Sequence, residues 1–267
     1  MSKAIYLGKQ ALQNHPKPVD GSFLSMDGDR FYRIANYQEM TPFFMSLVSP
    51  SDHWLFIASN GGLTAGRVNA ESSLFPYYTD DKITDGAEYT CAKTIIRVLG
   101  GDQLLLWEPV SEDGKGFYSI ESNLYKNTHG NRLRFEEINH DLKLRFAYEW
   151  SFSDRFGILR QAWIENLDDA ERSIELLDGI QNILPAGVGS ALQNGRSTLV
   201  DAYKKSELLK NGLAVYSLSA RIIDRAEPSY KEQSTQRDQQ TICKAFKKKI
   251  KANLPLRQIY LYCKFSL

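Results

Sequence analysis

One stretch of the sequence combines aromatic and acidic residues without the regular spacing of a helix or a strand. It is "LFPYYTDDKITD" (residues 74–85), in which Tyr77, Tyr78, Asp80 and Asp81 follow a proline. Aromatic rings pack against the apolar C–H faces of a sugar ring, while carboxylates accept hydrogen bonds from its hydroxyls. Because irregular segments often carry binding residues, the pattern predicts a ligand-facing loop or, as the alternative, a plain surface turn.

A second set of carboxylates lies in apolar or Gly/Pro-bracketed phrases and consists of Asp178, Asp201, Asp224 and Glu227. Glycosidic cleavage needs two carboxyl groups about 5 to 9 Å apart, and the sequence does not show which pairs meet. We therefore treat Asp178, Asp201 and Glu227 as candidate ligand-binding residues and assign no catalytic residue. The alternative is structural, with Asp178 at a strand-end turn and with Asp224, Arg225 and Glu227 in local ion pairs.

Other common sites lack the spacing that their chemistry needs. The four histidines are scattered and no HExxH or CxxC motif occurs, so we expect no metal site and no cofactor. The phrase "NGGLTAGR" (60–67) has glycines but no Lys-Ser/Thr end, and it is expected to form a hairpin turn. The phrase "GVGSA" (187–191) lacks the last glycine of a nucleophile elbow, and no histidine follows it.

The elements that would position these residues are mostly strands. Residues 143–152, "KLRFAYEWSF", alternate apolar and polar side chains, which indicates a half-buried β-strand. Residues 157–166 and 172–180 continue this pattern after short connections that leave no room for crossover helices. Further runs rich in β-branched and aromatic residues lie at 53–59, 88–99, 102–110 and 212–224.

These strands predict an all-β, mainly antiparallel fold: a large β-sandwich with one or two short helices, over residues 1–229. The helix that the periodicity favours is at 197–209, "STLVDAYKKSELL", with Ser197 as a candidate cap. Residues 230–267 are expected to form an atypical C-terminal tail with a polar loop, a basic run and one last strand, since apolar residues alternate over 259–267.

The composition argues against several partners. The chain has 33 Lys+Arg against 32 Asp+Glu and a net charge of +1, so no global field draws it to nucleic acid or to an anionic membrane. It has no signal peptide pattern and no apolar run of membrane-spanning length. Its three cysteines are odd in number and widely spaced, which fits reduced thiols. We therefore expect a cytoplasmic protein that contacts neither nucleic acid nor a membrane.

Four phrases, at 59–85, 174–188, 197–208 and 222–229, together carry a family resemblance. They resemble the N-terminal region of large bacterial proteins related to cellobiose and chitobiose phosphorylases, glycoside hydrolase family 94. The resemblance implies a galactose-mutarotase-like β-supersandwich, with the catalytic acid of the full-length proteins in a separate helical barrel. It brings no catalytic residue to this chain, and after Ser229 the sequence departs from the family pattern.

The function that the resemblance implies is a noncatalytic carbohydrate-associated domain, a fragment or truncated form of a larger protein. Its partners would be an oligo- or disaccharide and either its own catalytic domain or a second copy of the chain. The alternative is a self-sufficient enzyme such as a mutarotase-like epimerase or a lyase, with acid and base drawn from the carboxylates and His140. A third function is dimerisation without a ligand. No histidine lies in the phrases that carry the resemblance, so we favour the noncatalytic domain.

Overall fold

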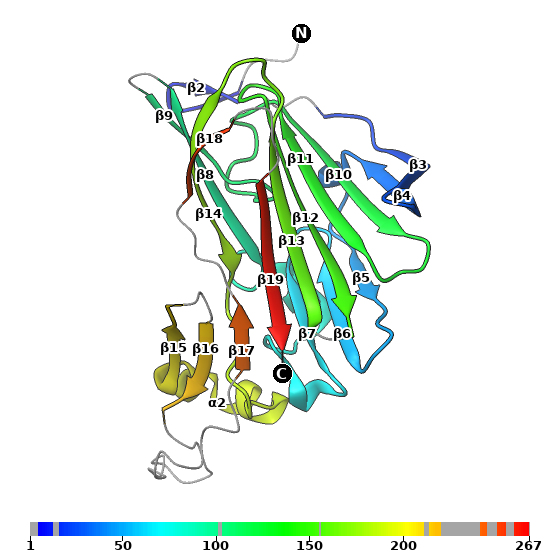
Figure 1. Cartoon of the computed structure of the whole chain (residues 1–267), viewed down its shortest axis with the longest axis vertical. Coiled ribbons are helices and arrows are strands. Elements are labelled where there is room, and N and C mark those ends of the chain that lie inside the picture. Colours follow the sequence, from blue (N-terminus) through cyan, green and yellow to red (C-terminus); the bar gives the residue numbers. More distant parts are fainter. Residues whose placement is uncertain are drawn as a thin grey trace.

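The computed structural model describes residues 5–12, 16–100, 103–154, 156–210, 214–219, 241–244, 250–254 and 259–266. Every strand pairing between named strands in these ranges is antiparallel. The predicted all-β, mainly antiparallel fold is therefore confirmed. Figure 1 shows long strands over most of the molecule, with the longer helix, α2, at one end.

The largest sheet has ten strands. In spatial order they are β15 (Lys204–Leu208), β16 (Ala214–Leu218), β17 (Thr241–Lys244), β19 (Ile259–Ser266), β13 (Gly157–Asn166), β12 (Leu144–Ser153), β11 (Leu133–Asn139), β10 (Ile120–Asn127), β4 (Asp29–Ala35) and β3 (Asp20–Met26).

Three smaller sheets and a few short helices complete the described part of the chain. The four-stranded sheet has the order β18 (Ile250–Leu254), β14 (Arg172–Ile180), β8 (Ala92–Gly100) and β9 (Gln103–Trp107). The other two sheets are β5 (Phe44–Leu47), β6 (His53–Ala58) and β7 (Leu63–Arg67), and the hairpin of β1 (Tyr6–Leu7) and β2 (Gln10–Ala11). The helices are η1 (Tyr37–Glu39), η2 (Ala70–Ser72), α1 (Asp80–Asp85) and α2 (Ser190–Tyr203). Among the described residues, no helix combines the length and the hydrophobicity that crossing a membrane requires.

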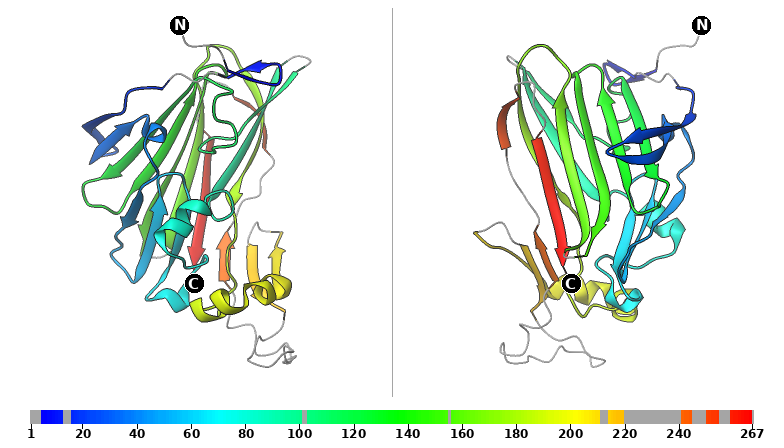
Figure 2. Two further views of the ribbon diagram at one scale, coloured as in Figure 1. Left: turned by 180° about the vertical axis from the view of Figure 1, so that it is seen from behind. Right: turned by 45° about the vertical axis from the view of Figure 1, so that its right-hand side comes forward.

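One hydrophobic core joins the largest sheet to the three- and four-stranded sheets, which lie across it (Figures 1 and 2). It contains Phe146 and Trp150 of β12, Leu55 of β6, Ile96 of β8 and Ile174 of β14, all with no exposed surface. Burying one large apolar side chain contributes about 1.5–3 kcal/mol. The shared core therefore fixes how the sheets face each other.

The strands predicted at 143–152, 157–166 and 172–180 are confirmed as β12, β13 and β14. β12 pairs with β13, so that Phe146 lies opposite Ile164. β14 instead pairs with β8 in the four-stranded sheet. The short connection after β13 therefore carries the chain from one layer to the other rather than into a third neighbouring strand.

The helix predicted at 197–209 is wrong in its bounds. α2 ends at Tyr203, Lys204 adopts extended backbone, and β15 pairs with β16. Lys204–Leu208 consists mostly of good helix formers, but propensity is a weak determinant and strand pairing outweighs it here. At its other end α2 begins earlier, at Ser190, and its geometry is broken at Arg196, with φ −146° and ψ 34°, directly before the residue predicted as a cap.

The last strand that the sequence predicts is confirmed as β19, which lies between β13 and β17. β18 pairs with β14 in the other layer. These ladders connect residues beyond 240 to strands within 1–229. Residues 220–240, which include Asp224 and Glu227, lie outside the described residues, as do residues 245–249 of the basic run.

Candidate functional site

Two of the residues that the sequence singles out, Tyr77 and Tyr78, line a hollow of about 620 Å³ between the start of α1 and α2. We name it the tyrosine hollow, and its lining is Tyr77, Tyr78, Thr79, Lys82, Gln193, Asn194 and Ser197. The two tyrosines are separated from α2 by more than a hundred residues of sequence, so the fold creates this site.

The backbone before the two tyrosines is tied to its neighbours on both sides. The Leu74 N–H donates to the Ala65 carbonyl at 2.7 Å, and the Leu184 N–H donates to the Leu74 carbonyl at 2.7 Å. The Leu74 side chain is buried. The ring of Tyr77 then meets Trp54 of β6 edge to face, with 5.6 Å between ring centroids. These contacts hold the tyrosines in place without a ligand.

The base of the tyrosine hollow holds a buried amide. Gln193 of α2 is 4% exposed, and its Nε2 donates to the Tyr78 hydroxyl at 2.5 Å. Its Oε1 is buried and has no hydrogen-bond partner among the described residues. Leaving a buried acceptor unpaired costs about 1–3 kcal/mol. At the rim, Lys82 Nζ lies 5.7 Å from the centroid of the Tyr78 ring.

The neighbouring acidic candidates do not line this hollow. Asp80 and Asp81 occupy the first turn of α1 and are exposed, and the Thr79 hydroxyl donates to Asp81. That hydrogen bond lowers the pKa of Asp81. Asp201 lies on α2 but is exposed, with its Oδ1 2.8 Å from Lys204 Nζ. The structure therefore brings together the two tyrosines but not the carboxylates predicted with them.

The Asp178 carboxylate forms a buried ion pair with Arg160. Arg160 donates from Nη1 and Nη2 to its two carboxylate oxygens at 2.7 and 2.9 Å, and the Thr94 hydroxyl donates at 2.6 Å. Arg160 belongs to β13, whereas Asp178 and Thr94 belong to β14 and β8, so the group connects the two layers across the core. Asp178 lies within β14 rather than at the strand-end turn proposed as its structural alternative.

A larger hollow of about 830 Å³ lies between β9, the segment that follows it and η1. Its apolar lining includes Leu105 of β9, which is 37% exposed and lies on the same face of the strand as Trp107, whereas Leu104 and Leu106 point to the other face. Its charged lining is mostly acidic, with two lysines against five carboxyl groups: Lys17, Lys115, Glu39, Glu108, Glu112, Asp113 and Glu137. We name this surface the acidic groove.

Glu137 of β11 is the buried carboxyl group of the acidic groove, at 4% exposure. Its Oε1 accepts from Trp107 Nε1 at 2.8 Å, and its Oε2 accepts from the Val110 N–H at 2.9 Å and from Gln38 Nε2 at 3.3 Å. Burial raises the pKa of Glu137 to about 7, and the negative charge of Glu112 adds to this effect. The donors come from β9, the segment after it and η1, so Glu137 connects the walls of the groove.

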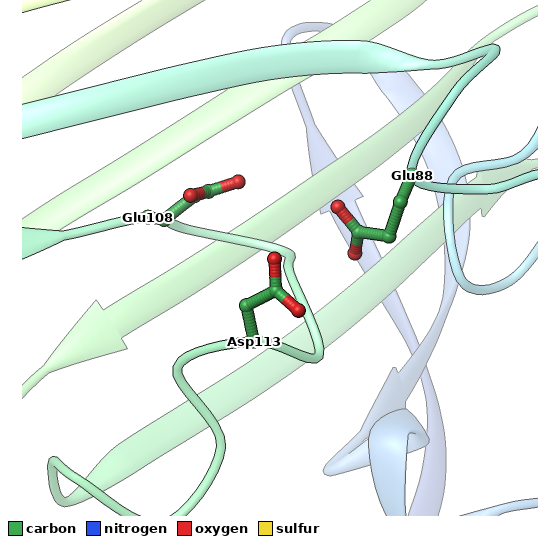
Figure 3. A group of neighbouring side chains, drawn as sticks. All are labelled: Glu88, Glu108 and Asp113. Carbon is green, nitrogen blue, oxygen red and sulfur yellow. The ribbon is translucent and has the colours of Figure 1, made fainter.

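Three acidic side chains, Glu88 beside the groove and Glu108 and Asp113 in its lining, each place one oxygen within 4.8 Å of the others (Figure 3). Lys93 already lies among them, since its Nζ is 2.5 Å from Glu88 Oε2 and also contacts Glu108. Burial tends to raise the pKa of Glu88, but the Lys93 ammonium and its hydrogen bond outweigh it, and the pKa is lowered. We therefore interpret the group as an ion-pair network.

Glu137 and Gln193, the long buried polar side chains of the two hollows, are not among the residues that the sequence singles out. A signal for Glu137 was present, because Leu133, Phe135 and Glu137 alternate along β11 and all three are buried. A carboxyl group at a core position of an alternating strand is unusual enough to mark a site. Gln193 had no such signal. Comparison with models of known protein families gives no match, and comparison with curated proteins gives none either.

Proposed function

We propose that this chain is a carbohydrate-binding β-domain without catalytic activity of its own, and that the acidic groove takes a neutral sugar. The observation that carries the proposal is the combination of apolar surface, from Leu105 and Tyr118, with several carboxylates in one hollow. A neutral sugar presents apolar C–H faces and hydroxyl donors together, and the two kinds of surface match them. The resemblance of the sequence to the N-terminal region of sugar phosphorylases supports the same class of ligand.

The lining residues have suitable roles in this proposal. The Tyr118 hydroxyl donates to the Leu106 carbonyl at 2.8 Å, which holds the tyrosine against β9. Leu105 and Tyr118 would pack against a sugar face, while the exposed Glu112 and Asp113 would accept hydrogen bonds from hydroxyls. The excess of carboxylates disfavours an anionic ligand. A neutral oligo- or disaccharide is therefore the ligand class that the groove fits best.

The contacts of Glu137 support binding without turnover. Both of its oxygens already accept hydrogen bonds from the protein, from Trp107, Val110 and Gln38. A carboxyl group engaged in this way holds the groove together and has little freedom to transfer a proton to a ligand.

A sugar-acting enzyme is the second candidate, and one observation favours it. The pKa of Glu137, raised to about 7 by burial, lies where an acid or base works best at neutral pH, and Glu112 lies in the same groove. In this candidate Glu137 would donate a proton and Glu112 would accept one. Turnover by the full chain that is lost in Glu137→Gln would favour the enzyme.

Three further parts of the proposal rest on the sequence. The resemblance favours a galactose-mutarotase-like supersandwich, and it favours a catalytic domain or a second copy of the chain as protein partner. The spacing of the cysteines favours a reducing, cytoplasmic environment. Burial raises the pKa of the Cys91 thiol to about 12, which keeps this thiol unreactive.

The proposal is tested by titrating the full chain with neutral disaccharides such as cellobiose, maltose and lactose, using calorimetry and saturation-transfer NMR. Leu105→Ser is expected to weaken binding at least about threefold, because it removes apolar contact area. The matched control is Leu177→Ser on β14, which is 38% exposed and lines neither hollow. Binding of no disaccharide, or equal effects of the two variants, would contradict the proposal. Assays of phosphorolysis and anomer interconversion on the same samples separate the two candidates.

A further inference from the structure

We propose that the tyrosine hollow is a second ligand site and that it binds a sugar acid, a hydroxylated ring with one carboxylate. The site is separate from the acidic groove and has no lining residue in common with it. The proposal therefore rests on the contacts of Gln193, Lys82 and the two tyrosines, and it stands whether or not the groove binds a neutral sugar.

The buried amide of Gln193 calls for a hydrogen-bonding ligand. Buried polar atoms are nearly always paired, and one that is not needs an explanation such as an absent ligand. Gln193 Oε1 is unpaired within the described part of the chain, although Nε2 of the same amide is bonded to Tyr78. A half-turn of the amide would leave Nε2 unpaired instead. A hydroxyl group both donates and accepts, so it satisfies the amide in either orientation.

The two tyrosines offer ordered aromatic surface beside this amide. Tyr77 is 37% exposed, and its ring is fixed edge to face against Trp54 at an interplanar angle of 87°. Tyr78 is half-buried, and its hydroxyl is held by Gln193. Side chains ordered before binding do not lose further conformational freedom when a ligand arrives. Sugar C–H faces suit such rings, as polar side chains around them suit hydroxyls.

Lys82 selects the charge of the ligand. Among the described residues that line the hollow, it is the only one with a formal charge, and its side chain is exposed. The other polar lining groups, Thr79, Asn194 and Ser197, are neutral. One ammonium group balances one carboxylate, whereas a phosphate dianion would leave charge unbalanced. A hydroxylated ligand with a single negative charge therefore fits the hollow better than a neutral sugar or a sugar phosphate.

The test is calorimetric titration of the full chain with methyl β-D-glucuronide and with methyl β-D-glucoside, which differ in the carboxylate. The glucuronide is expected to bind about threefold more tightly at low salt, the gain of one exposed ion pair. Lys82→Gln should remove this difference. Lys9→Gln, an exposed lysine in the turn between β1 and β2, is the charge control and should leave it intact.

Gln193→Leu is expected to weaken glucuronide binding about tenfold, the effect of losing a hydrogen bond to a buried amide. Tyr78→Phe keeps the ring, removes the hydroxyl that holds the amide, and should weaken binding in the same direction even if Gln193→Leu does not fold. Leu105→Ser in the acidic groove should leave glucuronide binding unchanged, which separates this proposal from the previous one. No binding of the glucuronide, equal affinity for both glycosides, or binding unaffected by both hollow variants would overturn it.

Discussion

The acidic groove and the tyrosine hollow lie toward opposite ends of the molecule, near β9 and near α2 in Figure 1. Each has a long polar side chain that is 4% exposed, Glu137 in the groove and Gln193 in the hollow. Glu137 accepts three hydrogen bonds, whereas Gln193 leaves Oε1 unpaired among the described residues. Glu137 and Gln193 are thus equally buried, but only Glu137 has all its buried oxygens hydrogen-bonded. We infer that the paired group holds its surface together and that the unpaired group is left for a ligand.

The largest expected effect is the loss of stability in Glu137→Leu. This substitution leaves Trp107 Nε1 and the Val110 N–H without their acceptor in a buried place. Each of the two unpaired donors costs about 1–3 kcal/mol, so the free energy of unfolding is expected to fall by about 2–6 kcal/mol. Urea unfolding followed by tryptophan fluorescence measures it. Glu112→Leu, at an exposed position of the same groove, is the control. A loss below about 1 kcal/mol would remove the structural role of Glu137.

The groove, unlike the hollow, is expected to respond to pH through its buried acid. The pKa of Glu137 is raised by burial from an ordinary 4.5 to about 7, so the folded chain keeps its proton where the unfolded chain has lost it. This contribution to stability is complete below pH 4.5, and it is lost as the pH rises toward 7 and levels off above it. The loss is on the order of 3 kcal/mol. Unfolding measured from pH 4 to 8 should show a weaker pH dependence in Glu137→Gln, and identical profiles would contradict the assignment.

The strands could be predicted from the sequence because half-buried strands show their period directly. Residues 143–152 alternate, and they form β12. The alternation along β11 also indicated the groove, since Glu137 lies at a buried position of that strand. The alternation of apolar and polar residues does not show to which sheet a strand belongs. β13 and β14 are neighbours in sequence but lie in different layers.

Only the tyrosine side of the tyrosine hollow could be predicted from the sequence, and the side formed by α2 could not. Tyr77 and Tyr78 were conspicuous because they follow Pro76 in an irregular phrase. Their partner Gln193 reaches them from α2, and no local pattern indicates that contact. Asp178 shows the opposite case, because a carboxylate in an apolar phrase suggested a ligand, whereas the fold supplies Arg160 as its partner. Long-range contacts decide which polar residues are already satisfied, and they are absent from local sequence.

The smallest expected effect is also the one that tests the comparison most directly. Gln193→Leu removes an atom that has no partner among the described residues, and the Tyr78 hydroxyl that it frees is on a half-buried ring that solvent can reach. The free energy of unfolding without ligand is therefore expected to change by less than about 1 kcal/mol. Urea unfolding should also show that methyl β-D-glucuronide stabilises the unmodified chain more than the variant, since a ligand stabilises only the state that binds it. A loss as large as that of Glu137→Leu would make Gln193 a structural residue like Glu137, and the distinction between the two surfaces would fail.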